Sequence, residues 1–190
     1  MRRSTATLLA LFAVPAVGFS AGTVRPLAAR SATVTPAVAL DDPTIVAIFD
    51  AANTADIETG MLAEKRGHAK EVREFGAMLA HDHTGVRKLG RDLAAKLGVT
   101  PTPPAGDNSA RDHAAAMKKL GALSGAEFDH AFLQHEVAYH KAVIDAVNST
   151  LLPAIKNAEL KALVVKVAPA FQAHMLAAQQ LDEKLSKAKP

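Results

Sequence analysis

The chain contains no cysteine and no tryptophan, and aromatic side chains make up only 4% of its 190 residues. The absence of cysteine excludes a disulfide, a thiolate metal ligand and a thiol nucleophile. Apolar residues nevertheless reach 49% of the sequence, and alanine is abundant among them. This composition favours closely packed helices over a β-sandwich, which requires more aromatic and β-branched residues.

Acidic residues are absent from the first forty positions, which hold four arginines (Arg2, Arg3, Arg25 and Arg30). These arginines account for the basic isoelectric point of about 9.2. Residues 41–190 contain 18 basic side chains (22 less these four) against 19 acidic ones. Because no basic excess remains in this part of the chain, we expect no nucleic-acid partner.

The N-terminal segment "MRRSTATLLALFAVPAVGFSAG" has the form of a secretory signal. Arg2 and Arg3 give the positive start, the apolar run Leu8–Val17 follows, and small residues come next. We therefore predict a signal peptide over residues 1–20 and a disordered linker over residues 21–40. The mature protein is expected to be exported, in the periplasm or associated with the cell envelope. No later segment is expected to form a transmembrane helix, and the sequence does not indicate an oligomeric state.

Apolar residues recur at three- and four-residue steps in four long segments of the 41–190 domain. The predicted helices cover residues 42–66, 69–97, 125–148 and 154–187, with a short helix from 109 to about 120. Asp42 is the predicted N-cap of the first helix, with Pro43 at the first helical position. Ser124 with Glu127 forms a capping box, and Gly98 ends a helix. The pattern predicts an all-α, four-helix bundle with a longer loop and a short extra helix between helices two and three.

Helical phase decides which histidines face the bundle interior. In "MLAHDHT", His81 and His83 lie about 200° apart on a helix, so they are not expected to bind the same metal ion. His83 continues the apolar stripe after Leu79 and is predicted to point inward. His174 continues the stripe after Phe171 in the same way.

Helix three carries a further inward group. Asp129, Glu136 and His140 are seven and four residues apart, so they project within about 40° of one another. In helix one the predicted stripe runs through Ile45, Ile48, Ala52, Ala55, Thr59 and Leu62. Glu58 flanks this stripe at the edge of the interior, and in helix two Asp82 precedes the inward His83.

These residues predict a metal site with Glu58, His83, His140 and His174 as ligands and Asp82, Asp129 and Glu136 as supporting residues. Imidazole and carboxylate ligands suit one transition-metal ion such as Zn, Fe, Mn or Cu. The first alternative is a structural or interaction bundle in which a buried histidine–carboxylate hydrogen-bond network holds no metal. The second alternative is a metal-dependent oxidoreductase. No residue is predicted to be catalytic, and the sequence favours a protein that is not an enzyme.

Three stretches, "AANTADIETGMLAEKRGHAKEVREFGAMLAHDHT", "LSGAEFDHAFLQHEVAYHKAVI" and "VAPAFQAHMLAAQQL", resemble the exported bacterial family named domain of unknown function 4142. The resemblance covers residues 42–186 and implies a ferritin-like fold and an exported location, but no established activity. Members of this family are often labelled outer membrane proteins. The family pattern maps onto Glu58, Asp82, His83, Phe128, Asp129, His140, Pro169 and His174.

The sequence departs from ferritins in one respect. Their di-iron sites use Glu-x-x-His motifs on two helices. Here Ala80, Val137 and Phe171 stand three residues before the three inward histidines. The departure favours a mononuclear site, or no metal, over di-iron chemistry.

Overall fold

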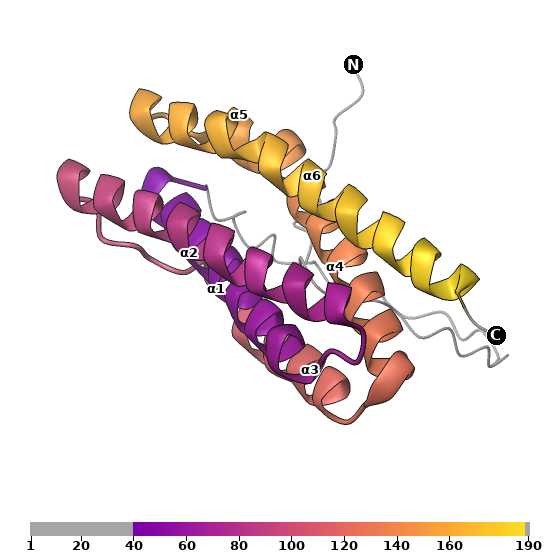
Figure 1. Cartoon of the computed structure of the whole chain (residues 1–190). Coiled ribbons are helices and arrows are strands. Elements are labelled where there is room, and N and C mark those ends of the chain that lie inside the picture. The colour runs from indigo at the N-terminus through magenta and orange to yellow at the C-terminus, as the bar shows by residue number, and fades with distance from the viewer. Residues whose placement is uncertain (1–39, 189–190) are drawn as a thin grey trace, which may run out of the picture.

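The computed structural model describes residues 40–188, and this part of the chain forms helices and no strand (Figure 1). The long helices are α1 (Asp42–Arg66), α2 (Lys70–Leu97), α4 (Gly125–Ala146) and α6 (Ala158–Lys187). The short elements are α3 (Ser109–Gly121), the π-helical turn η1 (Val147–Leu151) and α5 (Leu152–Ala154). The all-α prediction is confirmed. The expected signal peptide and most of the expected linker lie outside the described residues.

The long helices pack as two pairs, α1 with α2 and α4 with α6 (Figure 1). The first pair is held very close at two glycines. A Cβ atom on Gly60 would lie 2.7 Å from the carbonyl oxygen of Gly76, and one on Gly76 would lie 2.6 Å from that of Gly60. Only glycine permits this backbone approach.

Carboxylates at the helix ends show how the long helices run. Asp42 accepts hydrogen bonds from the backbone N–H groups of Lys156 and Asn157, both at 2.9 Å, so α1 and α6 begin at the same end. Asp129, near the start of α4, accepts from the backbone N–H groups that precede α2. Helices α2 and α4 are therefore parallel, and the long connection containing α3 joins them (Figure 1).

Two helix-start predictions differ in detail from the structure. The N-cap of α1 is Asp41, whose carboxylate accepts from the Thr44 N–H at 2.9 Å, while Asp42 is freed to bind the start of α6. Ser124 is the N-cap of α4 but its side chain forms no capping hydrogen bond. Gly98 ends α2 in the left-handed conformation (φ 64°), as predicted.

The described apolar core consists of two separate clusters, one at each end of the long helices. One cluster contains Ile45, Val46, Phe49, Ala94, Val147, Leu151, Ile155, Leu160, Val164, Val167 and Phe171. The other contains Ala63, Val72, Phe75, Leu79, Leu120, Phe128, Phe132, Leu133 and Ala178. In all four long helices the residues between the clusters include buried polar side chains. We call this region the polar layer.

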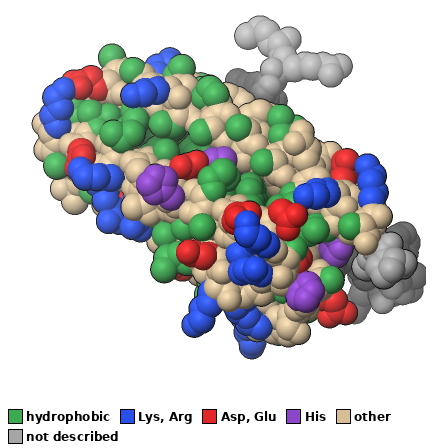
Figure 2. Space-filling model, viewed as in Figure 1, with side chains coloured by type: hydrophobic (Ala, Val, Ile, Leu, Met, Phe, Trp, Pro, Cys, Tyr) green, Lys and Arg blue, Asp and Glu red, His purple; other side chains and the backbone are tan. Residues whose placement is uncertain are grey.

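Among the described helices, α6 is long and apolar enough to cross a membrane when judged by length and composition alone. No such segment was expected from the sequence. The same helix supplies Leu160, Val164 and Phe171 to the core, and a core helix meets the same criterion. Basic and acidic side chains are interspersed over the face shown in Figure 2.

Candidate metal centre

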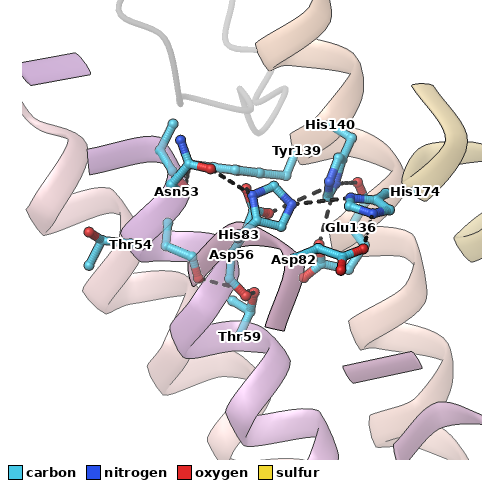
Figure 3. Close-up of polar contacts among 12 residues, drawn as sticks. Asn53, Thr54, Asp56, Thr59, Asp82, His83, Glu136, Tyr139, His140 and His174 are labelled. Atoms are coloured by element: carbon cyan, nitrogen blue, oxygen red, sulfur yellow. Dashed lines mark hydrogen bonds and ion pairs between the residues drawn. The ribbon is translucent and has the colours of Figure 1, made fainter. Parts of the chain in front are cut away.

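The polar layer brings side chains from all four long helices to one place (Figure 3). The contributing residues are Asn53 and Asp56 of α1, Asp82 and His83 of α2, Glu136 and His140 of α4, and His174 of α6. All but Asp82 are buried. Asp82 lies at the edge of the layer, with a side chain 42% exposed.

The three inward histidines meet at the centre of this layer. Their ring centroids are 5.1 Å apart for His83 and His174, 5.5 Å for His83 and His140, and 5.6 Å for His140 and His174. One ring nitrogen of each lies within 4.8 Å of the other two. The closest pair is Nε2 of His83 and Nδ1 of His174, at 3.2 Å.

The amide of Asn53 fixes the protonation of the His83 ring. Its Nδ2 donates to the carbonyl of Phe49 at 2.7 Å, which leaves Oδ1 facing Nδ1 of His83 at 2.9 Å. Because an amide oxygen only accepts hydrogen bonds, Nδ1 of His83 carries the proton. In the neutral ring, Nε2 then has a lone pair directed toward His174.

The other two rings are held by acceptors in the same way. Nε2 of His174 lies 3.2 Å from Oδ2 of Asp82, and Nδ1 of His140 donates to the backbone carbonyl of Glu136 at 3.0 Å. The remaining nitrogen of His140, Nε2, is buried and has no hydrogen-bond partner among the described residues. One nitrogen of each imidazole thus donates its N–H to an acceptor outside the three-histidine cluster. The second nitrogen of each ring does not take part in these outer hydrogen bonds.

Two carboxylates lie behind His83 and His140. Asp56 places Oδ2 3.4 Å from Nδ1 of His83 and Oδ1 3.9 Å from Nδ1 of His140. Glu136 places Oε2 3.4 Å from Nδ1 of His140. Asp56 Oδ1 and both oxygens of Glu136 are buried without a hydrogen-bond partner in the described chain. Unpartnered buried charge is costly, so this region attracts a cation or a proton.

Burial and neighbouring charges shift the pKa values of the three histidines in different directions. Burial, with the charges of His140 and His174, lowers the pKa of His83 to about 2. Burial and His140 also lower the pKa of His174, against the effect of Asp82. Burial lowers the pKa of His140 too, but Asp56 and Glu136 outweigh it and raise that pKa to about 9. Burial, reinforced by Glu136, raises the pKa of Asp56 well above its ordinary value.

Glu58, predicted as a ligand, points away from the three histidines. Its side chain is 51% exposed and pairs with His113, whose Nε2 lies 2.7 Å from Oε2. The predicted stripe of helix one followed Ala52, Ala55 and Thr59. The side chains that reach the polar layer are instead those of Asn53 and Asp56. Glu58 comes two residues after Asp56, which is a rotation of about 200° around the helix, so its side chain points to the opposite face.

Asp129, predicted as a supporting residue, lies at the end of the molecule rather than at the centre. Its carboxylate accepts from the backbone N–H groups of His68 at 2.7 Å and Ala69 at 2.8 Å, so it stabilises the start of α2. Asp82 and Glu136, the other two predicted supporting residues, do lie beside His174 and His140.

Asn53 and Asp56 were missed by the sequence analysis, although the sequence carries a signal for both. Phe49, Asn53, Asp56, Gly60 and Ala63 follow one another at steps of four, three, four and three residues, and all five are buried. This spacing is that of a core-facing stripe. The stripe was not recognised because Asn53 and Asp56 are polar.

Fold and centre together define an all-α protein with a buried histidine–carboxylate cluster between its helices. A family model described as "Domain of unknown function (DUF4142)" matches residues 27–181. The chain therefore belongs to this family, and the resemblance identified from the sequence is confirmed. Comparison with curated proteins finds no match, and neither does comparison with solved structures.

Proposed function

We propose that this protein binds a transition-metal ion between His83, His140 and His174. The observation that carries the proposal is the direction of the outer hydrogen bonds. Asn53 Oδ1, the Glu136 carbonyl and the Asp82 carboxylate all accept, so each ring turns a proton outward. The second nitrogen of each ring then carries a lone pair, and one nitrogen of each buried ring lies within 4.8 Å of the other two. Metal sites are built in this way when histidines donate their other N–H to an acceptor.

The shortest contact between two of the three histidines supports a cation at this place. With both outer nitrogens protonated and both rings neutral, His83 Nε2 and His174 Nδ1 face each other at 3.2 Å as two lone pairs. Two lone pairs repel, and an ion that both nitrogens coordinate removes the repulsion. Three imidazoles suit Zn²⁺, Cu²⁺, Fe²⁺ or Mn²⁺, with a position left for water.

We further propose that the bundle is ferritin-like and that the protein is exported. Parallel α2 and α4 joined by one long connection are the arrangement expected of ferritin-like bundles. Export rests on the sequence of residues 1–20, with its two arginines and apolar run. N-terminal sequencing of the protein from a periplasmic or envelope fraction tests it, and an intact residue 1 there would contradict cleavage.

A hydrogen-bond network without metal is the second candidate function, and the pKa of His140 favours it. With that pKa raised to about 9, the metal-free centre holds a protonated His140 against Asp56 and Glu136. A proton then supplies the positive charge that the carboxylates require. In this case the cluster contributes to stability and specificity only.

Metal titration of untagged, metal-free protein separates the two candidates. We expect wild-type protein to bind Zn²⁺, and His174→Gln to bind one equivalent fewer because Gln offers no imidazole nitrogen. The matched control is His130→Gln, since His130 also joins α4 to α6 but pairs with Asp182 outside the centre. Negligible Zn²⁺ binding by wild-type and variant alike would favour the hydrogen-bond network.

A further inference from the structure

We propose a second cation position beside the three-histidine site, formed by Asp56, Glu136 and Nδ1 of His140. The inference rests on the proposed function, because it makes His140 a bridge with Nε2 toward one ion and Nδ1 toward the other. The centre is then dinuclear, although the missing Glu-x-x-His motifs favoured a mononuclear site.

The unpartnered oxygens carry the argument. Glu136 is fully buried and neither of its carboxylate oxygens has a hydrogen-bond partner among the described residues. Asp56 is 3% exposed and its Oδ1 is likewise unpartnered. Within residues 40–188, histidines are the only basic side chains that pair with these two carboxylates. When both carboxylates are ionised they carry a formal charge of −2, which one divalent cation offsets.

The geometry brings three ligand atoms to this second position. Asp56, Glu136 and His140 each offer one ligand atom, and these atoms lie within 4.8 Å of one another. Nδ1 of His140 is 3.4 Å from Glu136 Oε2 and 3.9 Å from Asp56 Oδ1 (Figure 3). The ion at the first position replaces any proton on Nε2, and the second cation replaces the Nδ1 proton that His140 donates to the Glu136 carbonyl. Both protons are released to solvent, so His140 would bridge the two ions as an imidazolate.

The two positions differ in ligand chemistry. The first offers imidazole nitrogens, whereas the second offers two carboxylates and one imidazole nitrogen. Oxygen ligands favour harder divalent ions such as Mn²⁺ and Fe²⁺, and Zn²⁺ is compatible with both sets. The α4 ligands Glu136 and His140 are four residues apart, so this centre differs in spacing from the Glu-x-x-His motif of di-iron bundles.

Stoichiometry tests the proposal. Metal-free full-length protein is titrated with Zn²⁺, and we expect two equivalents for wild type. We expect one equivalent for the double variant Asp56→Asn, Glu136→Gln, which keeps the shape of both side chains and removes their charge. The matched control Glu58→Gln removes a carboxylate from the exposed face of α1, and we expect it to keep both equivalents.

Wild-type measurements decide the matter even if the double variant does not fold. One equivalent in wild type would overturn the second position and leave the three-histidine site intact, whereas no binding would overturn both proposals. Electron paramagnetic resonance of wild type loaded with two equivalents of Cu²⁺ gives an independent reading. A spin-coupled pair is expected for ions joined through His140, and two isolated Cu²⁺ signals would overturn the bridge.

Discussion

Nε2 of His83 lies 3.2 Å from Nδ1 of His174, although the two residues are 91 positions apart in the chain. The contact joins α2 to α6, and so joins the α1–α2 pair to the α4–α6 pair. Both nitrogens are the inner atoms of rings whose outer nitrogens are held by Asn53 and Asp82.

Metal is expected to stabilise the fold through this contact. An ion that binds only the folded state at a hundred times its Kd contributes about 2.7 kcal/mol. For a domain of this size that raises the Tm by roughly 5–10 °C. Thermal unfolding of metal-free protein with and without Zn²⁺ measures the rise. We expect it to be much smaller in His174→Gln and intact in His130→Gln, and an equal rise in both variants would contradict the assignment.

Asn53→Ala is expected to weaken metal binding without removing a ligand. The substitution takes away the acceptor at 2.9 Å that orients His83, and loss of such a supporting partner typically costs about 10–100-fold in affinity. Thr54→Ala is the matched control, because Thr54 is the next residue of α1 and bonds Arg87 outside the centre. Competition titration against a chelator measures both affinities, and an unchanged affinity in Asn53→Ala would refute the supporting role.

The stability of metal-free protein is expected to fall between pH 6.5 and pH 9. His140 has its ordinary pKa of 6.5 in the unfolded chain and a pKa of about 9 in the folded protein. Its contribution is therefore complete below pH 6.5 and is lost as the pH rises through 9, with a slope of up to about 1.4 kcal/mol per pH unit. Urea unfolding at several pH values measures this slope. His140→Gln should flatten it, while the exposed His81→Gln should leave it unchanged.

The Gly60–Gly76 contact is expected to be indispensable to the spacing of α1 and α2. Gly76→Ala places a methyl group against backbone atoms of α1 and should cost about 1–3 kcal/mol or more, as overpacking does. Gly85→Ala on the same helix meets nothing within 4 Å and should stabilise by about 0.5–1 kcal/mol. Denaturant unfolding of the two variants checks these opposite signs, and equal free energies of unfolding would disprove the steric account.

The sequence predicted the helices and the three inward histidines because both depend on local periodicity. His83 and His174 each continue an apolar stripe, and His140 shares one helix face with Asp129 and Glu136. These patterns can be read without knowledge of the partner helices, and all three histidines are buried. Helix α1 is less readable, because Asn53 and Asp56 replace apolar residues in its buried stripe. Choosing the more apolar stripe placed Glu58 at the edge of the interior, whereas its side chain is half exposed.

Helical periodicity could not predict hydrogen-bond partners that lie far apart in the chain. Asp129 was correctly placed on the inner face of its helix, and it is buried, but its partners are backbone amides 60 and 61 residues away. Asp42 was read as a cap for its own helix and instead bonds the start of α6, 114 residues on. A stripe gives the direction of a side chain, while its depth along the bundle and its partner depend on tertiary packing.

The division of the apolar core into two clusters also suggests how a metal ion reaches the buried histidines. Apolar clusters that meet only at a polar layer behave as two cooperative units, so one end can open while the other stays folded. The polar layer then forms the boundary between the open end and the folded end. Its histidines would be the first buried groups to become exposed to solvent. Amide hydrogen exchange should resolve two protection classes in metal-free protein, and a bound ion, by tying both units together, should merge them into one.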